Sequence, residues 1–283
     1  AMLERERNTS YHADSVAYMQ TLSKAKSGLE LGDEDDVFDQ IKEEDMEAKM
    51  EASMRKLGKK GKGKEGEGDK PKRRGRKCPT CEAVQSGSVT VAASSVACLL
   101  TPTHRQLVPG HITIVPREHC RNMADVSMGV AEGVRALMKS VAGVARQAKA
   151  QDSVLFIEAS CEGHALMHCI PIPVHHLQEI KGHLAREMSE GRNRVRQVSQ
   201  GIRTVGESVS GDVDYVWVQF GFTTLGGLVG VIQQDTPFPL SRVMDVIGSV
   251  LGLDVFQRRR PELTQEGRER VTRTLAPFYK GVE

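Results

Sequence analysis

A sharp change in composition near residue 77 limits where this chain of 283 residues can fold. Residues 30–51 carry eleven carboxylates against two lysines, and residues 59–77 carry ten lysines and arginines against three carboxylates. The formal net charge of +2 therefore hides two opposed blocks. Segments this charged and this poor in apolar side chains cannot bury enough surface to offset the entropy of an ordered chain. We expect residues 1–77 to be an acidic-then-basic flexible tail, with ordered structure from Cys78.

Two explanations of the charge blocks stay open from the residues alone. The blocks can be solvated and attract each other without any further role. Alternatively, the basic block contacts nucleic acid while the acidic block contacts a protein partner. In the second case the candidate phosphate contacts are Lys72, Arg73, Arg74 and Arg76.

The chain shows no sign of a membrane or secretory segment. No apolar run approaches the roughly eighteen residues of a membrane-spanning helix, and the first residues lack the basic and apolar regions of a signal peptide. We therefore expect a soluble, intracellular protein with no membrane partner. Its six cysteines are then expected to be reduced, so a closely spaced pair is considered first as a metal site.

The chain after residue 77 predicts two α+β parts. In the first, 78–176, apolar and β-branched runs predict strands at 89–100, 111–115, 153–159 and 165–173, and apolar residues at helical spacing predict a helix over 128–150. This order is typical of an antiparallel α+β domain of about a hundred residues. A second, smaller α+β domain is expected at 177–283. Its elements would be an arginine-rich helical region at 186–203, strands at 214–220 and 228–232, a helix capped by Ser241, and a last helix at 263–276.

Cys78-Pro-Thr-Cys81 is the sharpest local motif. Two thiolates with this spacing can bind one soft cation, but a tetrahedral site needs two more ligands. The other four cysteines stand alone in the sequence, so histidines would have to complete the site. A redox pair is less favoured because no βαβ pattern surrounds the motif, and coincidence stays open.

Two further segments resemble the histidine-triad (HIT) superfamily. Leu107-Val-Pro-Gly-His-Ile-Thr-Ile-Val-Pro-Arg-Glu-His119 is similar to its "PGH, strand, Pro-x-x-His" segment, and His164-Ala-Leu-Met-His-Cys-Ile-Pro171 falls where the superfamily has its His-x-His-x-His triad. Zinc-bearing members have a Cys-x-x-Cys near the start of the fold. The resemblance implies structural zinc held by Cys78, Cys81, His119 and His164.

Other motifs resemble the CwfJ family, splicing factors built from a HIT-like domain and a second, C-terminal domain, which the resemblance places at 177–283. These motifs are Phe156-Ile-Glu158, Cys169-Ile-Pro-Ile-Pro173, Tyr215-Val-Trp-Val-Gln-Phe-Gly221, Phe238-Pro239 and Ala276-Pro-Phe-Tyr279. The family is associated with the post-catalytic, intron-lariat spliceosome. The resemblance implies a nuclear protein in lariat release or debranching, with spliceosomal proteins, the lariat debranching enzyme and intron lariat or branched RNA as partners.

The residue at the position of the HIT nucleophile is Leu166. In HIT enzymes the middle histidine of the triad attacks phosphorus, which an aliphatic side chain cannot do. The resemblance therefore implies a non-catalytic protein; an active nucleotide hydrolase or transferase that uses His168 is the alternative. His168 and His111 are expected either to contact phosphate or to serve as hydrogen-bonded structural residues. Arg192, Arg194, Arg196 and the Arg258–Arg260 run are expected to be solvated or to bind RNA phosphates.

Overall fold

The structure, a computed structural model, describes residues 78–160, 163–189, 194–199, 204–232 and 240–281. The predicted tail at 1–77, with Lys72, Arg73, Arg74 and Arg76, lies outside the described residues, as does Arg192. None of the helices in the described part of the chain is long and apolar enough to cross a membrane.

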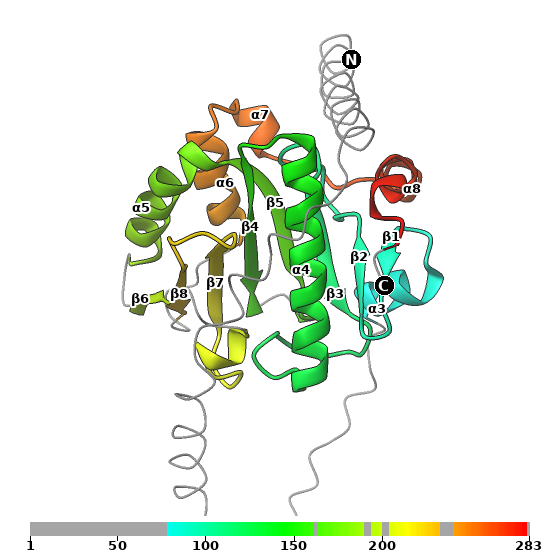
Figure 1. The fold of residues 1–283 in the computed structure, drawn as a ribbon, viewed down its shortest axis with the longest axis horizontal. Helices are drawn as coiled ribbons and strands as arrows, with labels where there is room; N and C mark the ends of the chain where they lie inside the picture. The colour runs from blue at the N-terminus through cyan, green and yellow to red at the C-terminus, as the bar shows by residue number, and fades with distance from the viewer. Residues whose placement is uncertain (1–77, 161–162, 190–193, 200–203, 233–239, 282–283) are drawn as a thin grey trace, which may run out of the picture. The chain divides into compact units, whose positions relative to one another are not determined.

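One antiparallel sheet of eight strands organises the described residues (Figure 1). Its order is β1 (Thr90–Ala93), β2 (Ala97–Leu100), β3 (Ile112–Pro116), β5 (Met167–Pro173), β4 (Asp152–Ala159), β7 (Tyr215–Phe220), β8 (Gly227–Val231) and β6 (Arg194–Val198). Every neighbouring pair of strands is antiparallel. The predicted antiparallel α+β fold is confirmed.

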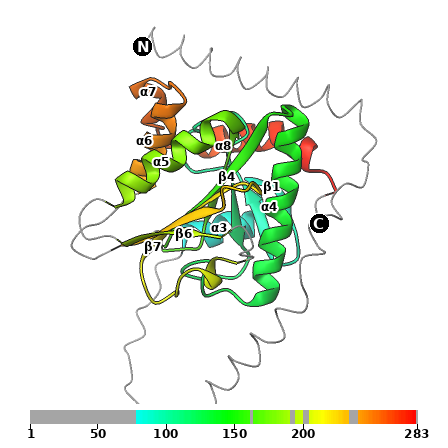
Figure 2. The ribbon, with the colours of Figure 1, turned by 60° about the vertical axis from the view of Figure 1, so that its left-hand side comes forward.

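Helices cover both faces of the sheet (Figure 2). One face packs against α4 (Met128–Ala148), whose buried residues include Val134, Leu137 and Val141. The other face packs against α5 (Leu177–Met188) and α6 (Leu240–Val250). The central strand β4 serves both cores, because successive side chains of a strand point to opposite faces: Phe156 lies in the first core, and Leu155 and Ile157 lie in the second.

Three further helices and several short turns complete the described part of the chain. They are α3 (Pro79–Ser86), α7 (Val255–Arg258) and α8 (Gln265–Leu275), with short 3₁₀ turns at η3 (Val174–His176), η4 (Val205–Glu207) and η5 (Ala276–Tyr279). The α6 helix begins at Leu240, so Ser241 is inside it rather than at the predicted cap. The predicted final helix is present as α8.

The sheet runs across the boundary that the sequence predicts at 176/177. Strand β7 from the second part pairs directly with β4 from the first, with Leu155 opposite Phe220 and Ile157 opposite Val218. Residues on both sides of the boundary therefore share one sheet and, in the described part of the chain, one compact unit. The two predicted α+β parts thus contribute strands to one sheet. Hydrophobic periodicity indicates where strands lie but not which strands pair.

The arginine-rich region also differs from its predicted helical structure. Helix α5 ends at Met188, and residues 194–198 form strand β6, paired with β8. The sequence Arg-Val-Arg-Gln-Val alternates polar and apolar residues, which is typical of a strand. Arg194 and Arg196 are exposed on β6.

Candidate metal centre and adjoining histidine pair

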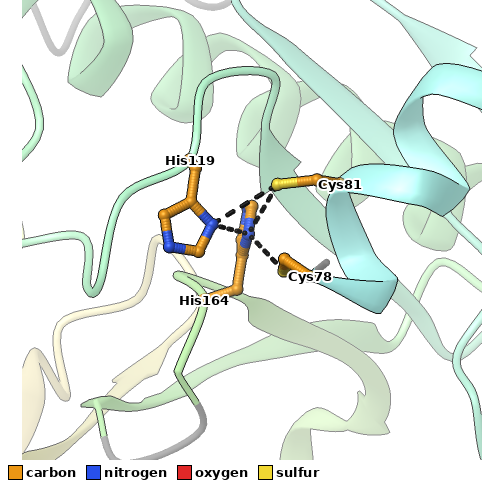
Figure 3. Close-up of side chains that lie close together, drawn as sticks. All are labelled: Cys78, Cys81, His119 and His164. Carbon is orange, nitrogen blue, oxygen red and sulfur yellow. Dashed lines mark hydrogen bonds between the residues drawn. The ribbon is translucent and has the colours of Figure 1, made fainter. Parts of the chain in front are cut away.

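Three segments that are distant in the sequence bring two cysteines and two histidines together (Figure 3). Cys78 is the N-terminal cap of α3, and Cys81 lies in the first turn of that helix, where Pro79 is well placed because it needs no hydrogen bond through its nitrogen. His119 follows β3, and His164 precedes β5. The structure thus groups the four residues that the resemblance named as ligands.

The ligand atoms of these residues converge on one point. All four lie within 4.8 Å of one another. Nδ1 of His164 lies 3.4 Å from Sγ of Cys78, 3.5 Å from Sγ of Cys81 and 3.1 Å from Nδ1 of His119, and the Sγ–Nδ1 distance from Cys81 to His119 is 3.3 Å. A tetrahedral zinc ion separates its sulfur and nitrogen ligands by roughly 3.3–3.8 Å. The residues therefore fit a four-coordinate metal ion with two sulfur and two nitrogen ligands.

The protonation chemistry also suits a cation. Burial, followed by the neighbouring His119, lowers the pKa of His164, which keeps its imidazole neutral with a lone pair for coordination. Burial, followed by the neighbouring Cys78 thiol, raises the pKa of Cys81, so two thiolates are unfavourable here unless a cation compensates their charge. His164 is buried and His119 exposed, so the site is open on one side.

A second pair of histidines lies on the same two strands of the sheet: His111 directly precedes β3, and His168 is in β5. His111 is fully buried and His168 is 7% exposed, with 2.9 Å between His111 Nε2 and His168 Nδ1. The backbone N–H of Leu107 donates to His111 Nδ1 at 3.2 Å, so the proton of the neutral His111 ring is on Nε2. His111 Nε2–H then donates to His168 Nδ1, which leaves the proton of His168 on Nε2. Burial is the main cause of the lowered pKa of both residues, to about 3 for His168, so both rings are neutral at physiological pH.

Leu166 has a hydrophobic environment. It packs with Cys98, Leu100 and Val115 of β2 and β3, beside Ala83 and Val84 of α3. Strand β5 begins at Met167, two residues after the predicted start of this strand at 165, so His164 and Leu166 precede it.

Glu158 has no role predicted from the sequence, although its carboxyl is fully buried in β4. The backbone N–H of Met123 donates to its Oε1 at 2.6 Å, and the Tyr215 hydroxyl donates to its Oε2 at 2.7 Å. Burial raises the pKa of Glu158 to about 8, and these two hydrogen bonds only partly oppose the rise. The signal in the sequence is an acidic residue near the end of the apolar run that begins at Val154 in β4.

Replacing Glu158 with glutamine is expected to change the pH dependence of stability. Between pH 4.5 and 8 the folded protein keeps the Glu158 proton that the unfolded chain has lost, so the free energy of unfolding falls as pH rises. Glu158→Gln does not titrate and so avoids this loss. The free energy of unfolding of Glu158→Gln minus that of the wild type should therefore rise by roughly 2–3 kcal/mol from pH 5 to pH 7. Urea unfolding of both proteins at each pH measures the difference, with Glu132→Gln on the exposed side of α4 as the control. Parallel pH curves for Glu158→Gln and wild type would show that the folded carboxyl is ionised.

Comparison with known proteins relates this region to a family. Residues 65–184 match the family described as "Protein similar to CwfJ C-terminal". No curated protein matches the chain.

Among solved structures, similar chains include SMU.412c from Streptococcus mutans, which is 21% identical over 37% of this chain and 71% of its own, with a TM-score of 0.31. A zinc-bound histidine triad family protein from Mycobacterium smegmatis is 16% identical over 34% of this chain and 74% of its own, with a TM-score of 0.30. A Hit-like protein involved in cell-cycle regulation from Bartonella henselae is 19% identical over 32% of this chain and 71% of its own, with a TM-score of 0.28. Residues 65–184, which include the four metal-site residues and the histidine pair, are therefore similar to the CwfJ C-terminal family.

Proposed function

We propose that this protein is a non-catalytic pre-mRNA splicing factor that acts on the post-catalytic intron-lariat spliceosome in the nucleus. The observation that carries the proposal is the match of residues 65–184 to the CwfJ C-terminal family, which supports a CwfJ-like splicing factor. In this role the protein contacts spliceosomal proteins, the lariat debranching enzyme and intron lariat or branched RNA, and it assists lariat release or debranching. One zinc ion in the Cys78, Cys81, His119 and His164 site would be structural.

The histidines support a non-catalytic role. Leu166, at the position of the HIT nucleophile, has no lone pair to attack phosphorus and packs against apolar side chains. His168 is also a poor nucleophile, because its Nδ1 accepts the hydrogen bond from His111 and its Nε2 carries the proton. Nδ1 of His164 is one of the four converging ligand atoms of the candidate metal centre. None of the three residues at the triad positions therefore presents a free imidazole lone pair.

Purification of the tagged protein from nuclear extract tests the proposed role. Excised intron lariats and proteins of the late spliceosome should be enriched in the purified material over pre-mRNA and spliced mRNA from the same genes. The control is the same purification from extract of cells without the tag. Equal recovery of lariat, pre-mRNA and mRNA, or recovery of none, would contradict the assignment to the intron-lariat stage.

An assay of the purified protein separates this function from a nucleotide hydrolase or transferase. We expect no covalent adenylyl or guanylyl intermediate and no hydrolysis of dinucleotide or phosphoramidate substrates. Turnover by the wild type that disappears in His168→Ala would establish the enzymatic alternative.

A further inference from the structure

His119 is the exposed member of the candidate metal centre, and it lies in the loop of residues 117–127 between β3 and α4 (Figure 3). The other ligands have firmer surroundings, because Cys81 belongs to α3 and His164 is buried. A histidine on an irregular, exposed loop binds a metal ion tightly only if other groups hold the loop in place. The contacts of loop 117–127 therefore bear on the metal centre.

Two buried side chains hold this loop against the centre of the sheet. The backbone N–H of Met123 donates to Oε1 of Glu158, in β4, at 2.6 Å. The backbone N–H of Ala124 donates to the Tyr215 hydroxyl, in β7, at 3.2 Å, and that hydroxyl donates to Oε2 of Glu158 at 2.7 Å. Glu158 and Tyr215 are both fully buried. If the loop moved away, their polar atoms would lose partners inside the core, which is unfavourable.

Residues 204–214, which include η4 and precede β7, pack against the same loop. The Nδ2–H of Asn122, a fully buried residue, donates to the Gly211 carbonyl at 3.0 Å. The backbones also approach closely, because a Cβ atom at Gly206 would lie 2.7 Å from the carbonyl oxygen of Ala124. Any larger residue at that position would push the two segments apart.

Loop 117–127 is also bonded to the segment of the second histidine ligand. The backbone N–H of Ala165 donates to the Cys120 carbonyl at 2.8 Å. Cys120 follows His119, and Ala165 follows His164, so this hydrogen bond joins the neighbours of the two ligands. A shift of the loop would therefore change the separation of the ligand nitrogens.

We propose that Tyr215 is a positioning residue for the metal ligand His119, and that it acts with Glu158 and Asn122 to hold loop 117–127 on the sheet. Tyr215 and residues 204–214 lie outside the residues that match the family, 65–184. The metal affinity of the matched region thus depends on the chain beyond it. This inference rests on the zinc site of the proposed function and is independent of the splicing role.

The rate of zinc release from the zinc-loaded full chain to an excess of chelator tests the positioning role. Tyr215→Phe removes the hydroxyl that accepts the Ala124 N–H, and it should speed zinc release by about ten-fold. Asn122→Asp keeps the size of the side chain but turns the donor to the Gly211 carbonyl into an acceptor. It should speed release by at least about five-fold, and it tests the same loop if Tyr215→Phe does not fold.

Two control variants separate positioning from a general loss of stability. Tyr279→Phe removes the hydroxyl of another buried tyrosine of the same core, in η5. Ile247→Val removes a buried methyl group from α6, on the other face of the sheet, and lowers the stability of the whole fold. Both variants should release zinc within about two-fold of the wild-type rate, because these positions share no contact with the loop.

A wild-type rate of release from Tyr215→Phe, or from Asn122→Asp if Tyr215→Phe does not fold, would overturn the positioning role. Equal acceleration by Tyr215→Phe and Ile247→Val would also overturn it, because global stability would then control release. A wild-type protein without zinc would reject the metal centre together with this inference. Zinc in the wild type with unchanged release from the variants would keep the metal centre and reject the positioning role alone.

Discussion

Cys81→Ser is expected to lower the free energy of unfolding by at least about 3 kcal/mol and to leave the protein without zinc. Few other contacts of α3 stabilise the start of the domain. Helix α3 has eight residues, none of them buried, and a helix of that length is marginal by itself in water. Only Ala83 and Val84 of this helix pack on the small cluster that contains Cys98 and Val115. A zinc ion that joins α3 to the segments after β3 and before β5 would supply most of the remaining stabilisation.

Cys120→Ser is the matched control for this substitution. Cys120 is next to His119 in the sequence and partly exposed, but its thiol is not among the four converging ligand atoms. Thermal unfolding should therefore shift strongly for Cys81→Ser and little for Cys120→Ser, and a chelator should lower the melting temperature of the wild type toward that of Cys81→Ser. Identical melting curves for Cys81→Ser and wild type would mean that the four residues hold no stabilising metal.

A fragment of residues 78–176, the first of the two predicted domains, is expected not to fold alone. This fragment lacks β7, so β4 loses its hydrogen-bonded neighbour on one edge. It also lacks α5 and α6, which cover the sheet face that contains Leu155, Ile157, Ile170 and Ile172. Each of these side chains is fully buried, so exposing them costs together roughly 6–12 kcal/mol. A domain of this kind has a total stability of about 5–15 kcal/mol, and β4 would also become an exposed hydrophobic edge that favours aggregation.

Circular dichroism and a proton–nitrogen spectrum of the fragment measure this outcome, with residues 78–283 as the control. The control should show dispersed signals and cooperative unfolding, and the fragment should show neither. A fragment of 78–176 that unfolds cooperatively would show that the first predicted domain folds without β7, α5 and α6.

The sequence predicts local elements of this fold well because their signals are local. Helix α4 follows from apolar residues at helical spacing, and β4 and β5 follow from apolar, β-branched runs. The pairing of β4 with β7 joins residues about sixty positions apart, and no local pattern specifies it. Strand β6 lies in a region predicted as helix from its arginines, and that prediction missed the local polar–apolar alternation of residues 194–198, which pair with β8.

The candidate site shows the same division between local and distant information. The spacing of Cys78 and Cys81 indicates half of a metal site, but the two histidine partners came from a family resemblance, because nothing in the spacing relates His119 to His164. The tautomers of His111 and His168 depend on the Leu107 amide and on the hydrogen bond between two histidines 57 positions apart. Such contacts require the folded chain.

One zinc ion is expected to join three distant segments through Cys78, Cys81, His119 and His164. Native mass spectrometry of the full-length protein, combined with X-ray absorption at the zinc edge, measures both the metal content and the ligands. We expect one zinc per chain with two sulfur ligands near 2.3 Å and two nitrogen ligands near 2.0 Å, and no zinc in Cys81→Ser. A folded wild-type protein without bound metal, or zinc with a ligand set that Cys81→Ser leaves unchanged, would contradict this expectation.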